Sequence, residues 1–339
     1  MESAFTTTPP KRPASSSASR DLPLAVGPAI RIAFLMRPSP SVLSMPLVAT
    51  LISHPAARLV TPALATMASQ AVGASAISWL GETVACDLTL PERLDKDEAT
   101  ARLRATLGDQ PIDAVVHDAA MRRKKILLAD MDSTMIDQEC IDELADEVGM
   151  KEKVAAITAR SMNGEIAFEP ALRERVALMK DLELSVVDRI IRDRLTLASG
   201  GRALVQTMRR NGAWTALVSG GFDVFTSQIA EKLGFQENRA NRLIVADGRL
   251  TGEVAEPILG RAAKAEALSE IAIGRDADAG DVLAVGDGAN DLDMIRLAGM
   301  GVALHAKPAV AAEARIRIDH GDLTALLYLQ GYRREEFAT

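Results

Sequence analysis

The chain has 339 residues, of which 48% are hydrophobic, so it is long enough for roughly two or three folding units with sizeable cores. Its net charge of −7 gives no general attraction to nucleic acid or to an acidic membrane surface, which indicates small solutes as partners and no nucleic acid or membrane. The only cysteines are Cys86 and Cys140, which excludes a disulfide framework and a cysteine zinc site.

Residues 1–44 are rich in Ser, Pro, Thr and Ala and carry more basic than acidic side chains. This composition is typical of a disordered extension. The apolar stretch 30–36 is too short to span a bilayer and is followed at once by Pro38 and Pro40. A targeting segment is the alternative for this extension, and a true start at Met45 is another.

Residues 46–120 alternate short apolar runs with helix-like stretches in the order strand, helix, strand, strand, helix, strand. The expected strands are 47–52, 76–80, 84–90 and 114–117, and the expected helices are 62–72 and 96–107. This order is typical of a ferredoxin-like α+β module and resembles ACT-type domains, which bind amino acids or mediate dimer contacts in other enzymes. We expect a structural module or one that forms a homodimer rather than a regulatory sensor, because no ligand loop stands out.

Two carboxylates follow the apolar run 126–129, in the sequence Asp130-Met-Asp132-Ser-Thr134. A strand that ends in this way places the carboxylates at the carboxyl edge of a parallel sheet, where α/β folds bind ligands. Such a pair suits a hard cation such as Mg²⁺, and one member can act as a nucleophile towards phosphorus. The ordinary alternative is a polar turn after a core strand, because Asp and Ser dominate turns.

Further segments with candidate functional residues follow downstream. An apolar strand ends in Ser219-Gly220-Gly221, the Asp247-Gly248 pair marks the turn of a hairpin over 243–250, and Lys264 lies in a helix-like stretch. A second acidic strand end then appears in Gly286-Asp287-Gly-Ala-Asn290-Asp291. Two acidic strand ends can converge on one metal ion.

Taken in order, Asp-x-Asp-x-Thr, Ser-Gly, Lys and Gly-Asp-Gly-x-Asn-Asp resemble the motifs of the haloacid dehalogenase superfamily of phosphotransferases. The resemblance implies an α/β fold, with a Rossmann-like parallel sheet and a small helical cap inserted after its first strand. Over 125–332 the chain is similar to phosphoserine phosphatases, whose substrate-recognition positions in the cap match Glu139, Phe168 and Arg175. The expected cap is at about 137–200, where the pattern Met162-Asn-Gly continues the match, and no second large cap fits before Lys264.

The resemblance also implies roles at the strand ends. Asp130 would be the nucleophile that forms an aspartyl-phosphate, and Asp132 would protonate the departing oxygen and later deprotonate the attacking water. Mg²⁺ would be held by Asp130, the main-chain carbonyl of Asp132 and Asp287. Asp291 would orient Lys264 or a metal-bound water.

Phosphoryl oxygens would be held by the Ser219 hydroxyl and the Gly220 amide, and the Lys264 ammonium would offset their charge. Asn290 would contact the substrate or its phosphate. A solvated surface lysine is the ordinary alternative for Lys264.

Substrate choice would depend on opposite charges, since O-phosphoserine carries an α-ammonium suited to Glu139 and an α-carboxylate suited to the Arg175 fork. Phe168 would shield the closed site from water. The ordinary alternatives are a core phenylalanine and a solvent-facing arginine that pairs with Glu174 or Asp181. Arg173 is a competing candidate for the carboxylate.

The resemblance thus implies a cytoplasmic Mg²⁺-dependent phosphatase that converts O-phospho-L-serine to serine and phosphate, the last step of serine biosynthesis. One alternative is a related phosphatase or phosphotransferase acting on another small phosphoester, such as phosphohomoserine or phosphothreonine. The other is an amino-acid-binding regulator without turnover, against which the intact Asp130, Asp132, Lys264 and Asp287 argue.

Overall fold

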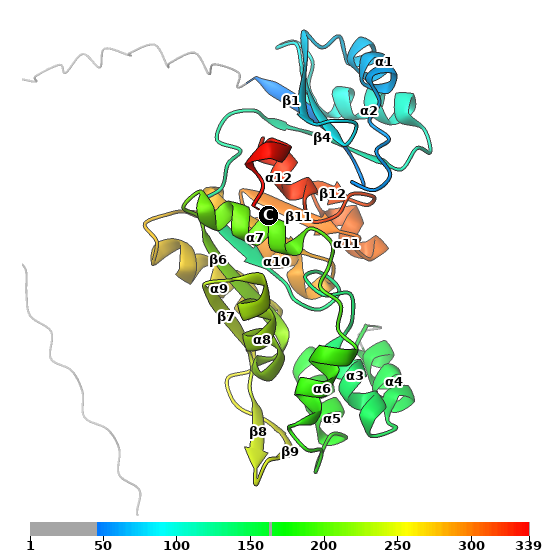
Figure 1. The fold of residues 1–339 in the computed structure, drawn as a ribbon. Helices are drawn as coiled ribbons and strands as arrows, with labels where there is room; N and C mark the ends of the chain where they lie inside the picture. The colour runs from blue at the N-terminus through cyan, green and yellow to red at the C-terminus, as the bar shows by residue number, and fades with distance from the viewer. Residues whose placement is uncertain (1–45, 163–164, 339) are drawn as a thin grey trace, which may run out of the picture. The chain divides into compact units, whose positions relative to one another are not determined.

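The computed structural model describes residues 46–162 and 165–338 (Figure 1). The predicted extension at 1–44 and the Asn163-Gly164 part of the cap pattern lie outside the described residues. Residues 46–338 contain a small antiparallel sheet, a larger parallel sheet and a helical insertion.

The N-terminal module, residues 46–120, forms a four-stranded antiparallel sheet in the order β2-β3-β1-β4 with two helices. Its elements are β1 (Leu47–Ser53), α1 (Pro62–Val72), β2 (Ala76–Gly81), β3 (Ala85–Thr89), α2 (Lys96–Leu107) and β4 (Ile112–Asp118). Both helices begin at side-chain caps, since Thr61 accepts from the Leu64 amide (3.2 Å) and Asp95 accepts from the Glu98 amide (2.8 Å). The predicted order of elements is confirmed.

The two faces of this small sheet are both covered. Ala49 and Leu51 point to one face and join the core formed with α1 and α2. Ile52 points to the opposite face, where it joins a core that includes Tyr328 of α12 (Ala325–Leu329). The period of two along β1 therefore supplies one apolar face to the helices of the module and one to the C-terminal part of the chain.

A buried carboxylate of the module also contacts the C-terminal part of the chain. Asp113 of β4 is 6% exposed and accepts hydrogen bonds from the amides of Asp319 (2.8 Å), His320 (3.2 Å) and Gly321 (2.7 Å). The turn at 319–321 thus directs three backbone donors at a buried carboxylate, which satisfies donors that would otherwise be unpaired.

The larger sheet has six parallel strands in the order β12-β11-β10-β5-β6-β7. The strands are β5 (Ile126–Ala129), β6 (Trp214–Phe222), β7 (Glu237–Asn241), β10 (Val282–Gly286), β11 (Met300–Leu304) and β12 (Ile316–Ile318). The central strands β5 and β10 are fully buried, as expected for a parallel sheet with helices on both faces. The predicted α/β fold is confirmed.

Alternate residues of β5 pack against different helix layers. Ile126 and Leu128 share a core with α9 (Arg261–Ile273) and α10 (Leu292–Leu297). Leu127 and Ala129 share a core with helices on the other face. These are α7 (Gly201–Arg210), α8 (Asp223–Leu233) and α12. The shorter elements are α11 (Pro308–Glu313) and the single turns η1 (Ala279–Asp281), η2 (Ala289–Asp291) and η3 (Arg334–Glu336).

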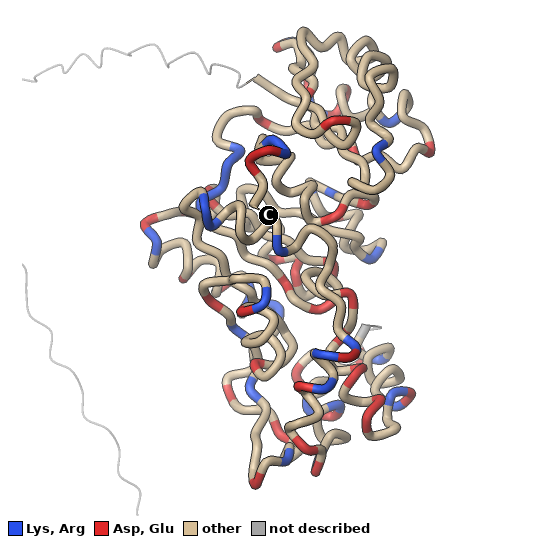
Figure 2. The backbone as a smooth tube through the Cα atoms, in the orientation of Figure 1, with Lys and Arg blue, Asp and Glu red and all other residues tan. Residues whose placement is uncertain are grey.

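The helical insertion lies between β5 and α7, as predicted. It consists of α3 (Cys140–Glu147), α4 (Lys151–Met162), α5 (Phe168–Ala177) and α6 (Val186–Asp193). Acidic and basic residues are both present along these helices (Figure 2), and several form ion pairs, such as Arg160–Glu174 and Arg189–Glu147.

The only insertion between β7 and α9 is a hairpin, as predicted. Strands β8 (Leu243–Ala246) and β9 (Arg249–Val254) are joined by Asp247 and Gly248, with φ of 49° and 75°, which suits an Asp-Gly turn. Strand β9 packs against α5 of the cap.

Candidate active site

Three neighbouring strands end at one edge of the parallel sheet and carry the predicted site residues. Asp130 follows β5, Ser219 lies near the end of β6, and Asp287 follows β10. Because β10, β5 and β6 are adjacent and parallel, their carboxyl ends meet. The Asp130 amide still donates to the carbonyl of Val285 (3.0 Å), so the sheet ladder holds this residue in place.

Lys264 of α9 is completely buried between two carboxylates. Its Nζ atom lies 2.7 Å from Oδ1 of Asp130 and 2.6 Å from Oδ1 of Asp291. Burial alone would lower the pKa of Lys264, but the two carboxylates outweigh it and hold that pKa above its ordinary value. Lys264 is therefore a charged residue of the site, and the alternative of a solvated surface lysine is wrong.

Asp291 belongs to the same buried cluster. Its Oδ2 accepts from the amide of Gly288 (2.9 Å), while its Oδ1 accepts from Lys264. Burial raises the pKa of Asp291, with Asp130 adding to the rise and Lys264 opposing it. Glycine is required at position 286, because a Cβ atom there would lie 2.3 Å from Cγ of Asp291.

The carboxylates of Asp130, Asp287 and Asp291 offer oxygens that all lie within 4.8 Å of one another. Thr134 donates to Oδ1 of Asp287 (3.2 Å), and the Met131 amide donates to Oδ1 of Asp130 (2.8 Å). In the described part of the chain, Oδ2 of Asp130 and Oδ2 of Asp287 have no hydrogen-bond donor. Two oriented carboxylates with a free oxygen each fit a hard divalent cation.

The charge balance of the cluster also fits a cation. Burial raises the pKa of Asp287, and the charge of Asp130 raises it further, while Lys307 and the hydrogen bond from Thr134 oppose the rise. Asp132 does not contribute a carboxylate to the cluster. The sequence motif Asp-x-Asp-x-Thr thus divides its acids between two places, and its threonine orients the acid of a different strand.

Asp132 lies between the cap and the end of β6. Its Oδ1 accepts from the Cys140 amide (3.0 Å), and its Oδ2 lies 3.5 Å from the Ser219 hydroxyl. Burial raises the pKa of Asp132 to about 7, and the Glu139 carboxylate adds to the rise. A Cβ atom at Gly221 would lie 2.8 Å from Oδ2 of Asp132, so this close approach requires glycine.

The end of β6 at Ser219 and Gly220 is held in place by a residue that the sequence did not indicate. Asn241, at the end of β7, donates to the carbonyls of Gly220 (2.8 Å) and Leu259 (3.1 Å) and accepts from the Leu259 amide (2.6 Å). Ser219 is 1% exposed, and its hydroxyl accepts from the Gly221 amide (2.9 Å).

Phe168, the first residue of α5, and Asn290 of η2 both lie near Gly220. A Cβ atom at Gly220 would lie 3.5 Å from Cζ of Phe168 and 3.9 Å from Nδ2 of Asn290. Phe168 also lies against Gly260, at 3.3 Å from the corresponding Cβ position. The first residue of α5 therefore brings the cap against the strand ends, and Phe168 is only partly buried there.

The two charged cap candidates, Glu139 and Arg175, are close enough for the charge of one to affect the other. Glu139 accepts from the Ser133 hydroxyl (2.9 Å), and burial raises its pKa. Arg175 donates to Thr158 Oγ1 (3.2 Å) and to the Ala171 carbonyl (3.2 Å). Burial lowers the pKa of Arg175, and the charges of Asp142 and Glu139 oppose that change.

The ordinary alternatives for the cap arginines can now be compared. Glu174 pairs with Arg160, and no ion pair of Arg175 is present among residues 46–162 and 165–338, so the proposed pairing of Arg175 with Glu174 or Asp181 is wrong. Arg173 pairs with Glu256 and is exposed. Arg175 thus keeps a guanidinium without a carboxylate partner, whereas Arg173 does not.

Lys307 is a second residue that the sequence analysis missed. It follows β11, and its Nζ atom lies 3.9 Å from Oδ2 of Asp287. The signal that could have found it is its position, since β11 is the next strand beside β10 and its carboxyl end must open onto the same edge.

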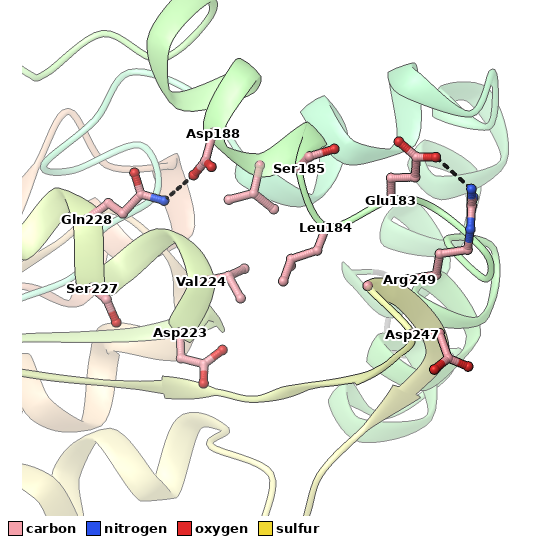
Figure 3. A pocket seen from close by; sticks show the side chains of 12 residues that line it. Glu183, Leu184, Ser185, Asp188, Asp223, Val224, Ser227, Gln228, Asp247 and Arg249 are labelled. Carbon is pink, nitrogen blue, oxygen red and sulfur yellow. Dashed lines mark hydrogen bonds and ion pairs between the residues drawn. The ribbon is translucent and has the colours of Figure 1, made fainter.

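A well-formed cavity lies away from these residues. It has a volume of about 700 Å³ and is formed by the start of α6, the start of α8 and the hairpin turn (Figure 3). Two pairs of its polar side chains interact, Asp188 with Gln228 and Glu183 with Arg249. None of the predicted site residues lines it.

Among the described residues, no helix is both long and apolar enough to cross a bilayer.

Comparison with known proteins agrees with this geometry. Residues 127–296 match the family model described as haloacid dehalogenase-like hydrolase. A phosphoserine phosphatase of Streptomyces coelicolor is 37% identical over 293 residues, which cover 85% of this chain and 71% of that protein. A phosphoserine phosphatase of Methanocaldococcus jannaschii is 43% identical over 206 residues, which cover 61% of this chain and 97% of that protein.

Among solved structures, a haloacid dehalogenase family hydrolase from Salmonella enterica serovar Typhi superposes with a TM-score of 0.76 at 27% identity, covering 84% of this chain and 98% of that one. The similarity therefore includes the N-terminal module as well as the parallel sheet. The chain belongs to the phosphoserine phosphatase family of the haloacid dehalogenase-like hydrolases.

Proposed function

We propose that this enzyme hydrolyses O-phospho-L-serine to L-serine and phosphate through an aspartyl-phosphate on Asp130. The observation that carries the proposal is the position of Asp130, whose Oδ1 is engaged by Lys264 while its Oδ2 is free, below a cap that presents Glu139 and Arg175. The two relatives are phosphoserine phosphatases, which favours the same substrate here.

Asp130 Oδ2 attacks phosphorus, so that a carboxyl oxygen to phosphorus bond forms while the bond from phosphorus to the serine oxygen breaks. Lys264 holds Asp130 in one orientation and lies beside the oxygens on which charge accumulates. The Ser219 hydroxyl and the Gly220 amide donate to the phosphoryl oxygens, and Asn241 holds the end of β6 that carries them.

Asp132 gives its proton to the departing serine oxygen and later takes a proton from the water that hydrolyses the intermediate. This role requires a carboxyl group that is neutral in the first step and charged in the second. The raised pKa of Asp132, about 7, suits both states near neutral pH. Its Oδ2 lies beside Ser219, which is the side where the phosphoryl group would be held.

Phosphatases of this family generally depend on a metal ion, and the acid cluster supplies suitable donors. We propose Mg²⁺, held by Asp130, Asp287 and the main-chain carbonyl of Asp132, with Asp291 acting through Lys264 instead of as a ligand. When bound, the ion would neutralise charge on the phosphoryl oxygens. Thr134 contributes by fixing the orientation of Asp287.

Substrate choice would come from Glu139, which suits the α-ammonium, and Arg175, which suits the α-carboxylate. Arg175 is partly buried and, within the described part of the chain, donates to neutral acceptors, so a carboxylate would be its first charged partner. Phe168, which lies against Gly220, would exclude water from the closed site, and Asn290 would contact the phosphate side.

The organisation of the chain is part of the proposal. Residues 46–120 would form a structural or dimer-forming module, residues 125–332 the phosphatase domain, and residues 137–200 its cap. The two cysteines are buried and form no disulfide, as expected if the enzyme acts in the reducing cytoplasm.

The test is phosphate release from L-phosphoserine in the presence of Mg²⁺, compared with phosphothreonine, phosphohomoserine and sugar phosphates at matched concentrations. We expect phosphoserine to have the highest kcat/KM and chelation to abolish turnover. A higher kcat/KM for another phosphoester would refute the substrate, and retention of activity after chelation would refute the metal.

A further inference from the structure

Lys307 lies at the mouth of the site on a loop with fixed backbone. It precedes Pro308, the first residue of α11, and its amide donates to the main-chain carbonyl of Asp287 (3.3 Å). Two residues earlier, His305 donates from Nε2 to the Gly321 carbonyl (2.8 Å) and from its amide to the Ile318 carbonyl (2.8 Å). Hydrogen bonds of the Lys307 amide and of His305 thus hold the loop, and the Lys307 side chain takes no part in them.

The Lys307 ammonium differs from that of Lys264 in its surroundings. Lys264 is buried and lies 2.7 Å or less from two carboxylates. The Lys307 side chain is 50% exposed, and its Nζ is 3.9 Å from Oδ2 of Asp287, too far for a hydrogen bond. Two of the three N–H donors of Lys264 are engaged by carboxylates, whereas the Lys307 ammonium makes no hydrogen bond among the described residues.

The charges that face Lys307 come from two segments. Asp287 follows β10 and Glu139 precedes α3. The positive charge of Lys307 lowers the pKa of Asp287 and of Glu139, partly offsetting the effect of burial. The ammonium therefore faces both the carboxylate with the free oxygen and the cap carboxylate.

We propose that Lys307 is a binding residue with two opposed effects: its ammonium competes with the divalent cation for Asp287, and it attracts the anionic phosphate of the substrate. The competition follows because a cation at Oδ2 of Asp287 and an ammonium 3.9 Å from the same atom repel each other. The attraction follows because a half-exposed ammonium beside the phosphate-binding edge adds positive charge where a dianion enters.

This inference rests on the proposed function only in that the substrate carries a phosphate. The metal part is independent of turnover and is measured without substrate. The variants are Lys307→Met, which keeps the length of the side chain and removes its charge, and Lys307→Arg, which keeps the charge. The control is Lys232→Met, which removes an exposed lysine at the far end of α8 from Ser219.

Calorimetric titration with Mg²⁺ alone should show that Lys307→Met binds the ion about fivefold tighter than the wild type. In steady-state assays with saturating Mg²⁺, the KM for phosphoserine should rise about fivefold to tenfold, with a smaller change in kcat. Lys307→Arg and Lys232→Met should stay within about twofold of wild type in both measurements. Inorganic phosphate should bind the Mg²⁺-loaded Lys307→Met variant about fivefold more weakly.

Opposite changes in metal and phosphate affinity distinguish this role from a structural one, since a distorted site would lose both affinities. Weaker Mg²⁺ binding by Lys307→Met, or unchanged affinities for both ligands, would overturn the inference. If wild-type enzyme failed to hydrolyse phosphoserine, the proposed function would fall, while the Mg²⁺ and inorganic phosphate titrations would still decide the role of Lys307.

Discussion

The completely buried ammonium of Lys264 donates to Asp130, and its Nζ atom lies 2.7 Å from Oδ1 of the carboxylate. This contact occupies one oxygen of the carboxylate and leaves the other as the only one that can attack. The pair joins α9 to the end of β5, so the lysine of the third sequence motif fixes the acid of the first.

Replacing Asp130 with Asn should remove the nucleophile while preserving its volume. We expect kcat to fall by at least about 10³-fold, because the amide cannot form the acyl-phosphate. Rapid acid quench with phosphorus-labelled substrate should trap a phosphorylated wild-type protein and no label on the variant. Labelled protein in the variant would assign the nucleophile to another residue.

Replacing Lys264 with Met should reduce stability as well as activity, because it leaves Asp130 and Asp291 buried without their cation. Breaking a buried ion pair on one side costs about 3–5 kcal/mol. Asp291 can relieve part of this cost by taking a proton, so we expect a loss of about 3 kcal/mol in the free energy of unfolding measured with urea. The Lys264→Met/Asp291→Asn double variant should recover part of that stability. No recovery would show that the charge of Asp291 is not the cause.

The pH dependence of kcat/KM should report Asp132. Because burial raises the pKa of Asp132 to about 7, the acid form that protonates the leaving group is present below that pH and is lost above it. We expect kcat/KM for phosphoserine to fall above about pH 7. A leaving group such as p-nitrophenolate needs little protonation, so its alkaline fall should be weaker. Equal profiles for the two substrates would exclude Asp132 as the acid.

Much of this arrangement could be predicted from the sequence, since apolar runs bounded by polar turns mark buried strands. The helices 62–72 and 96–107 begin and end in the structure where their caps and breakers indicate. The ends of β5 and β10 could be predicted because each apolar run in the sequence is followed directly by an aspartate. Parallel strands then force those acids to one edge.

The site and interface residues that could not be predicted from the sequence depend on contacts between distant segments. Asn241 and Lys307 have no local pattern that distinguishes them from loop residues, and only the placement of β7 and β11 in the sheet gives them partners. The three amides that donate to Asp113 belong to residues more than 200 positions away. Sequence periodicity carries no information on such pairs.

Arg175 should determine preference for a substrate carboxylate. Arg175→Ala should raise the KM for phosphoserine by about tenfold or more, because a charged hydrogen bond contributes about 1.5–3 kcal/mol. The KM for p-nitrophenyl phosphate, which has no carboxylate, should change much less. The matched control is Arg173→Ala, whose guanidinium pairs with Glu256. Equal losses on both substrates would contradict carboxylate recognition.

Asp113 should hold the N-terminal module to the phosphatase domain. Asp113→Ala would leave the amides of Asp319, His320 and Gly321 without their acceptor. Gly321 is buried, and a buried unpaired donor costs about 1–3 kcal/mol. We expect faster hydrogen exchange at 319–321 and faster proteolysis between 119 and 125, where the two parts are joined. Asp109→Ala, which removes an exposed acid of the same module, should change neither.

The same variant tests whether the contact reaches the active site. The turn at 319–321 also supplies the Gly321 carbonyl to His305, and His305 lies two residues before Lys307. If Asp113 fixes this turn, Asp113→Ala should loosen the loop and raise the KM for phosphoserine, whereas Asp113→Asn, which keeps one carbonyl acceptor, should show a smaller rise. Faster exchange at 319–321 with an unchanged KM would limit the role of Asp113 to holding the module in place.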